Sequence, residues 1–170
     1  KLGRFQRHSR LWIVPFGNIQ KAIVDGCYPE YRTLLFRWYM VKTATLLAKK
    51  IRAQALITGD ALAQVSSQTL QNISVVDHAT ELPILRPLLG MNKSEIINIS
   101  QEIDIYDISV LPHDDACSLL APKRPIIKGK LEYVQEFDKL HNLDEQISLA
   151  LEESERHGIH VTGESYIYDE

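Results

Sequence analysis

The sequence has few cysteines, no long apolar run and no excess of positive charge. Its two cysteines, Cys27 and Cys117, make no disulfide framework, which favours a reducing compartment, so we expect a cytoplasmic protein. No apolar run approaches the ~20 residues that a membrane span needs, which argues against a membrane partner. A net charge of −3 argues against this chain supplying the main surface for RNA.

The sequence does have the composition of an ordinary globular domain, with 45% hydrophobic and 24% charged residues in a chain of 170. We therefore predict one domain over residues 1–170. Apolar runs that alternate with helical spacing predict strands over 11–14, 55–58 and 83–88 and a long helix over 30–52. This alternation indicates an α/β fold.

The carboxyl-terminal part has helical spacing and no chemistry that we can name. Two amphipathic helices are predicted over 130–140 and 142–157, the second ended by Gly158. We expect a helical tail over about 130–170. Metal-ligand spacing is absent from the sequence, so no residue is predicted to bind a metal.

Residues 55–70 are the most informative stretch. An apolar run leads into a turn at Gly59 and Asp60, followed by a polar run that contains Gln68 and no lysine or arginine. In α/β proteins, a nucleotide cleft is built from a strand, a glycine turn and a helix that begins with serine. Gly59 would let a ligand lie against the backbone. On these features alone, serines that merely cap a helix are the commoner explanation.

Arg37 lies on the predicted long helix among uncharged neighbours. The residues three and four positions away are Thr33, Leu34, Met40 and Val41. A guanidinium keeps its charge and needs an acceptor, either a protein carboxylate or a bound anion. A side chain that extends past apolar neighbours into water is the alternative.

Arg86 ends the strand predicted over 83–88 and could contact a ligand or pair with an acidic neighbour such as Glu95. Asn92, three residues before Glu95, predicts a helix that begins with a capping box. Ile96, Ile99 and Ile103 give this helix an apolar face.

Cys117 lies in a proline-flanked loop, four residues after His113. Such a cysteine is a candidate nucleophile or persulfide carrier. Asp114 and Asp115 would raise its pKa, and a buried, inert thiol is the alternative. Cys27 sits in a turn without catalytic spacing and is interpreted as a spectator.

The pattern T-G-[DE]-x-L-x-Q-V-x-S-Q-T, matched by residues 58–69, resembles the signature of the tRNA 4-thiouridine synthetase family, thiamine-biosynthesis sulfurtransferases with a PP-loop ATP-pyrophosphatase domain. L-R-P-L at 85–88 and the cysteine loop resemble the family too. The resemblance covers about Val14 to Pro125. Many members have two adjacent cysteines in this loop, whereas here Ala116 precedes Cys117.

The resemblance implies a three-layer, Rossmann-like α/β domain of the adenine nucleotide alpha hydrolase type, with a mostly parallel sheet. It also implies adenylation of a tRNA uridine with ATP and Mg²⁺, then sulfur insertion to give 4-thiouridine, with a link to the thiamine thiazole. Arg37, Gly59 and Gln68 would bind the nucleotide, with Asp60 adjacent, and Cys117 would carry the sulfur.

The family's partners are tRNA, bound mainly by an amino-terminal RNA-binding domain, and a persulfide donor such as a cysteine desulfurase; a homodimer is a further option. The family's phosphate loop, S-G-G-x-D-S, does not occur in this sequence, so we expect the later part of a longer catalytic domain. A non-catalytic partner or dimerisation module is the alternative. A basic cluster could face tRNA or be solvated loop: Lys123, Arg124, Lys128 and Lys130.

Overall fold

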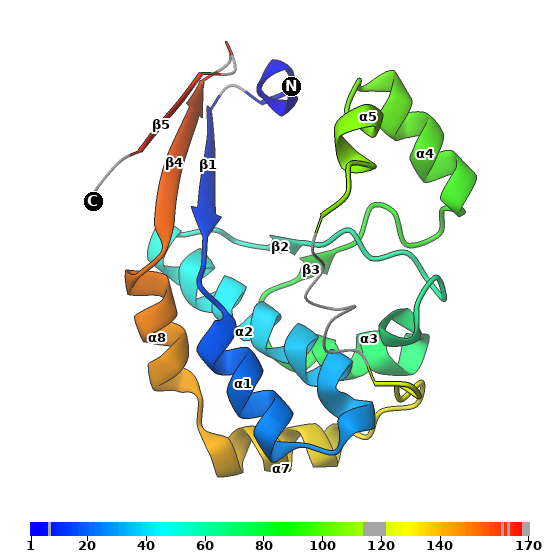
Figure 1. Cartoon of the computed structure of the whole chain (residues 1–170), viewed down its shortest axis with the longest axis vertical. Coiled ribbons are helices and arrows are strands. Elements are labelled where there is room, and N and C mark those ends of the chain that lie inside the picture. The colour runs from blue at the N-terminus through cyan, green and yellow to red at the C-terminus, as the bar shows by residue number, and fades with distance from the viewer. Residues whose placement is uncertain (7, 114–121, 161, 163, 168–170) are drawn as a thin grey trace.

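The computed structural model describes residues 1–6, 8–113, 122–160, 162 and 164–167. Helices gather around α2 in one layer, and the strands form two separate sheets above it (Figure 1). The helices of at least eight residues are α1 (Gly17–Gly26), α2 (Arg32–Ile51), α3 (Leu70–Asp77), α4 (Lys93–Glu102), α7 (Leu131–His141) and α8 (Asp144–Glu152). The shorter ones are η1 (Leu2–Arg4), η2 (Pro29–Tyr31), η3 (Ser66–Gln68) and α5 (Tyr106–Ser109). The strands are β1 (His8–Ile13), β2 (Leu56–Ile57), β3 (Ile84–Leu85), β4 (Glu155–His160) and β5 (Ser165–Ile167).

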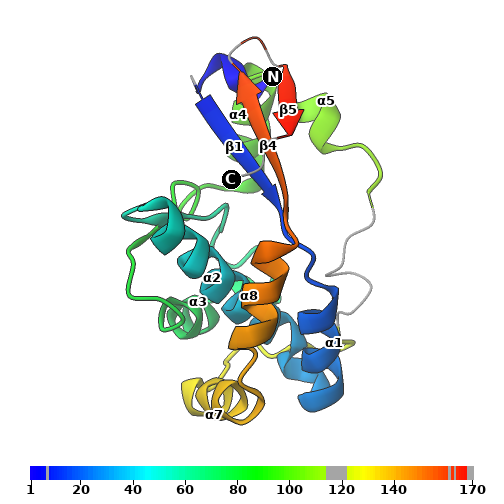
Figure 2. The ribbon, with the colours of Figure 1, turned by 90° about the vertical axis from the view of Figure 1, so that its left-hand side faces the viewer.

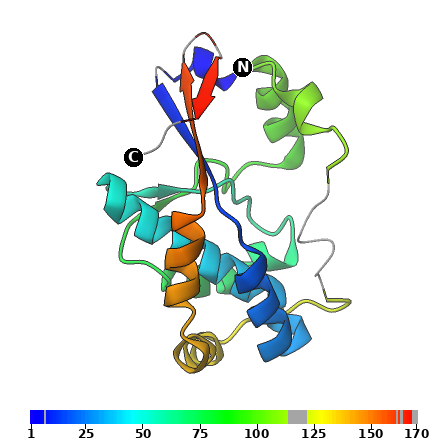
Figure 3. The same cartoon turned by 60° about the vertical axis from the view of Figure 1, so that its left-hand side comes forward.

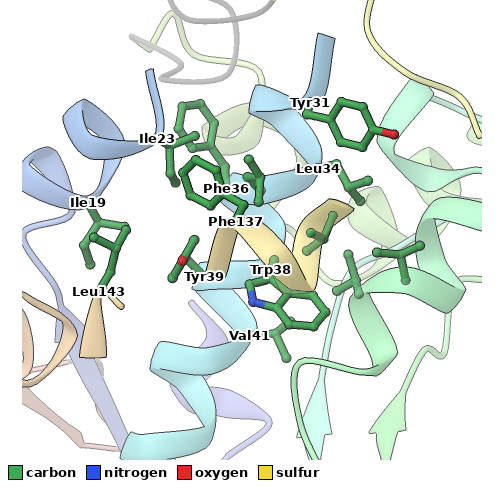
Figure 4. Close-up of a cluster of buried hydrophobic side chains, with 14 of the residues drawn as sticks. Ile19, Ile23, Tyr31, Leu34, Phe36, Trp38, Tyr39, Val41, Phe137 and Leu143 are labelled. Atoms are coloured by element: carbon green, nitrogen blue, oxygen red, sulfur yellow. The ribbon is translucent and has the colours of Figure 1, made fainter. Parts of the chain in front are cut away.

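Helix α2 is the centre of the hydrophobic core. It buries side chains on several sides, because α1, α3, α7 and α8 all supply residues to the same cluster (Figure 4). Tyr39 and Leu35 are completely buried. The prediction of a long helix over 30–52 is confirmed. The packing of this helix fixes the backbone position of Arg37.

Strands β2 and β3 form the parallel pair, with Leu56 opposite Ile84 and Ile57 opposite Leu85. The N–H of Thr58 donates to the carbonyl of Leu85 and extends the pairing beyond β2 by one residue (3.0 Å). The signature therefore begins at the carboxyl end of a parallel strand, as predicted.

The second sheet is antiparallel, with the order β1-β4-β5, and the sequence did not predict it. β4 pairs with β1 from His8 opposite His160 to Ile13 opposite Glu155. The prediction of a helix over 142–157 and of a helical tail to 170 is wrong here, because α8 ends at Glu152 and the chain turns into β4. The Arg156 guanidinium stacks on the Trp12 ring (4.7 Å to the ring centroid), a contact between the two ends of the chain.

Helices α4 and α5 stand apart from the helical layer (Figures 2 and 3). The predicted capping box is confirmed: the Asn92 side chain accepts from the Glu95 N–H, and Glu95 accepts from the Asn92 N–H. The predicted apolar face is only partly covered, since α4 has no fully buried residue. Lys1 pairs with Asp104 at the end of this unit (3.0 Å). None of the helices described is long and apolar enough to cross a membrane.

Candidate nucleotide-binding site

The signature folds into a compact loop that leaves Gly59 open. Gly59 is exposed, and a Cβ built there would meet no atom within 4 Å. The N–H of Ala63 donates to the Gln68 carbonyl (2.9 Å), and the N–H of Leu62 donates to the Leu89 carbonyl (3.0 Å). Ala63 has a left-handed backbone (φ 60°), which a non-glycine residue rarely adopts without surrounding support. These bonds hold Gly59 and Gln68 in place beside open surface.

Asp60 is the buried centre of the site, with 3% of its surface exposed. Its Oδ1 accepts from an Arg37 terminal nitrogen and, at 3.5 Å, from Gln68 Nε2. Its Oδ2 accepts from the Thr58 hydroxyl (2.8 Å) and from Arg86 Nε (3.1 Å). A carboxylate has about four lone-pair sites, so Asp60 has no acceptor site left for a ligand. Asp60 thus contacts Arg37 and Gln68, two of the residues predicted to bind the nucleotide.

The pKa of Asp60 is set by two opposed effects. Burial alone would raise it, but hydrogen bonds from Arg37 and Thr58 and the charge of Arg37 hold it below its usual value. The stability gained is therefore complete above the pKa of an unfolded aspartate, about 3.9, and is lost as the pH falls through the lower folded-state pKa. We expect the free energy of unfolding, measured in urea, to fall more between pH 7 and pH 3 in the parent than in Asp60→Asn. Equal losses in the two proteins would contradict this assignment.

Arg37 has donors to spare. One terminal nitrogen contacts Asp60, so the protein carboxylate is the acceptor that the sequence left undecided. Its Nε is buried and has no hydrogen-bond partner among the described residues. A buried donor without a partner costs about 1–3 kcal/mol. Because this nitrogen is closed to solvent, what Arg37 offers the nucleotide that the resemblance implies is its charge, on a side chain that is 20% exposed.

Arg86 pairs with Asp60 and with Asp77, and the Glu95 pairing considered from the sequence is wrong. Glu95 closes its own capping box instead. Asp77, at the end of α3, is a residue that sequence reasoning missed. Asp77 and Glu95 each lie nine residues from Arg86 in the sequence, so spacing alone could not choose between them.

Hydrogen bonds of Thr69 and Asn72 hold the end of the signature in place. Thr69 caps α3 by accepting from the Asn72 N–H (3.2 Å), so the alternative in which serines cap the helix is wrong. The fully buried Asn72 side chain donates to the carbonyls of Ser66 (2.7 Å) and Ile126 (2.8 Å) and accepts from the Gly129 N–H (2.8 Å). The segment at 126–129 is thereby held beside the signature.

An open pocket of about 630 Å³ lies along the other side of the loop. It is lined by signature residues and by the turn before α4: Leu62, Gln64, Val65, Leu89, Gly90, Met91, Asn92 and Lys93.

Asp60 does not offer a free oxygen to a metal ion, because its donors occupy both oxygens. Among the described residues, no group of three or more His, Cys, Asp or Glu side chains could hold an ion. Mg²⁺ in proteins is often held by one or two carboxylates together with substrate phosphates.

The structure describes Cys27 but not Cys117. Cys117, with Asp114 and Asp115, lies outside the described residues, so its predicted role is not tested by the geometry. Burial raises the pKa of the Cys27 thiol to about 11, and the opposing charge of Arg32 offsets this only in part. Cys27 is thus a thiol at neutral pH, which supports its interpretation as a spectator.

Comparisons with known proteins agree with one another. The family model described as thiamine biosynthesis protein (ThiI) matches residues 1–143. The protein named "Probable tRNA sulfurtransferase" of Thermus thermophilus is 43% identical over 155 residues, which cover 91% of this chain and 38% of the relative. Its namesake in Moorella thermoacetica is 42% identical over 146 residues, covering 86% and 37%.

A solved structure gives the same result for the fold. A crystal structure of a 4-thiouridine synthetase–RNA complex with bound ATP matches with a TM-score of 0.82 and 29% identity, over 89% of this chain and 39% of that one. The Rossmann-like α/β class is confirmed by this match. The chain spans about two fifths of the length of these relatives. It belongs to the ThiI family of tRNA sulfurtransferases.

Proposed function

We propose that this chain is the part of an ATP-dependent tRNA sulfurtransferase that binds the adenine nucleotide and carries the sulfur that converts a tRNA uridine to 4-thiouridine. The observation that carries the proposal is the meeting of Arg37, with 20% of its side chain exposed, and Gln68 on the carboxylate of Asp60, directly after the open Gly59. The names of the relatives and the ATP in the structural neighbour support it.

Each residue has a role that its geometry allows. Arg37 offers a positive charge to an anionic group of the nucleotide. The Gln68 carbonyl oxygen makes no hydrogen bond within the described part of the chain, so it is available to an amino or hydroxyl donor. Gly59 lets the ligand approach the backbone. ATP would supply the adenylyl group that activates the uridine oxygen, with Mg²⁺ held by its phosphates.

The tRNA would approach the segment at 126–129, which Asn72 holds by hydrogen bonds. Lys128 and Lys130 are exposed on either side of Gly129, whose N–H is bonded to Asn72. Their charge is therefore presented from a fixed backbone, where phosphates can be neutralised. Cys117 precedes this segment in the sequence and is the proposed carrier of the sulfur, received from a persulfide donor such as a cysteine desulfurase.

Calorimetric titration of the chain with ATP tests the nucleotide site. We expect Arg37→Ala to weaken ATP binding by at least about tenfold, since a charged hydrogen bond is worth about 1.5–3 kcal/mol. Gln68→Ala should weaken it about threefold to tenfold, because the amide is neutral. The heat of binding at several ATP concentrations gives the affinity directly.

Gln71→Ala is the matched control, since Gln71 is an exposed glutamine of α3 that does not contact Asp60. It should bind ATP like the parent. Parent-like binding by both Arg37→Ala and Gln68→Ala would show that the nucleotide lies elsewhere.

Sulfur transfer toward the thiamine thiazole is a second candidate, favoured by the description of the matching family model. Loss of 4-thiouridine from tRNA in a deletion strain, against thiamine auxotrophy with normal tRNA, distinguishes the two products.

A further inference from the structure

Four charged side chains form an alternating row through the site. Arg37 of α2 pairs with Asp60, Asp60 with Arg86, and Arg86 with Asp77 at the end of α3. The exposed fraction of the side chains is lowest in the middle, 4% for Asp60 and 9% for Arg86, and rises to 20% for Arg37 and 45% for Asp77. The row thus runs from the nucleotide side of the site, through the interior, to the opposite surface.

The two arginines use their donors differently. Arg86 bonds Asp60 through Nε and Asp77 through a terminal nitrogen, so both edges of its guanidinium are held by protein. Arg37 contacts Asp60 through a terminal nitrogen, and its Nε has no partner among the described residues. Arg37 is therefore the arginine available to a ligand, whereas Arg86 is held by two aspartates and supports Asp60.

Asp60 connects Arg86 to Arg37 and Gln68, the side chains proposed to bind the ligand. It accepts from both arginines and from Gln68, and it has no acceptor site left. The charges of the two arginines and two aspartates in the row cancel, so Arg86 affects Arg37 by fixing the position of Asp60. Without Arg86, Oδ2 of Asp60 would keep only the Thr58 hydroxyl, and the carboxylate could turn toward Arg37.

We propose that Arg86 and Asp77 are positioning residues of the nucleotide site, which act on Arg37 through Asp60. The inference rests on the proposed function for its effect on ATP. Neither residue touches the ligand, so their influence must disappear when Arg37 is absent. A residue that only supports the fold would act equally in both backgrounds.

A double-mutant cycle on ATP affinity tests this. Asp77→Asn is the main variant, because Asp77 is half-exposed and its loss leaves the fold's core intact. We expect it to weaken ATP binding about threefold, and Arg86→Lys, which keeps the charge but not both contacts, about tenfold, within the range of coupling between neighbours. In the Arg37→Ala background each effect should vanish. Equal weakening in both backgrounds would overturn the proposal.

Lys42→Met is the matched control. Lys42 also joins two carboxylates, Asp138 (2.9 Å) and Asp144 (2.7 Å), but on the α7–α8 side of α2. It should lower the melting temperature and leave ATP affinity unchanged. A loss of affinity in this variant would show that any broken ion pair disturbs the site, which contradicts a specific route through Asp60.

A second readout needs no nucleotide. In spectra of the chain with ¹⁵N-labelled arginine, the Nε–H signal of Arg37, assigned by its loss in Arg37→Ala, should shift in Asp77→Asn and in Arg86→Lys. An unchanged signal in both would reject the positioning role. If the parent failed to bind ATP, the proposed function would be overturned, and these spectra would still decide the positioning.

Discussion

Asp60→Ala should lower the free energy of unfolding by about 3–5 kcal/mol, the cost of breaking a buried ion pair from one side. The substitution leaves Arg86, with 9% of its side chain exposed, and Arg37, with 20%, facing an empty position. The Thr58 hydroxyl and the Gln68 amide lose their acceptor too. Urea unfolding at pH 7, followed by circular dichroism, measures the difference from the parent.

Asp138→Ala is the comparison that isolates burial. Asp138 also binds a cation on α2, but Lys42 keeps its second partner, Asp144, and the pair lies nearer to water. We expect a loss of about 1 kcal/mol or less. If Asp60→Ala and Asp138→Ala destabilise equally, Asp60 is not the organising charge of the site.

Cys117→Ser should abolish sulfur transfer to tRNA while leaving adenylation intact, because a hydroxyl cannot carry a persulfide. A free thiol with a pKa of about 8.5 is only a few per cent thiolate at neutral pH, so the site must lower it. Lys123 and Arg124 are exposed and close in sequence, and their charge opposes that of Asp114 and Asp115. The measurement is thiolation of unmodified tRNA, with a persulfide donor, by an enzyme that contains this chain.

Cys27→Ser is the control for that experiment. Cys27 is half-buried, with a pKa raised to about 11, so its thiol takes no part in persulfide exchange at neutral pH. The variant should thiolate tRNA like the parent. Parent-like thiolation by Cys117→Ser would instead make Cys117 structural, and the resemblance to the family would fail at this residue.

The sequence predicted the parts of the fold whose signals are local. The helix around Arg37, the strand before Gly59 and the capping box at Asn92 each depend on residues within a few positions of one another, and each is confirmed. β4 was missed because its pairing partner, β1, lies at the other end of the chain. Periodicity in residues 142–157 could not reveal a partner that distant.

The same distinction holds for the site. The helical neighbours of Arg37 cannot neutralise it, which showed only that it needs an acceptor; its assignment to the nucleotide, with Asp60 adjacent, came from the resemblance to the family. Arg86 does pair with acidic groups, but Glu95, the example considered from the sequence, is not one of them. Asp77 and Glu95 each lie nine residues from Arg86, so distance along the chain could not choose between them.

The β1–β4 ladder also has a consequence for the order of folding. Its pairs join residues 8–13 to residues 155–160, so the first of them closes a loop of nearly the whole chain. Contacts of such long range form slowly, whereas helices that pack with near neighbours along the chain form early. We expect the layer around α2 to be structured in the transition state and the ladder to close afterwards, with φ-values near 0 in β1 and β4 and higher values in α2. The two ends of the chain would then meet last, on a helical layer that is already in place.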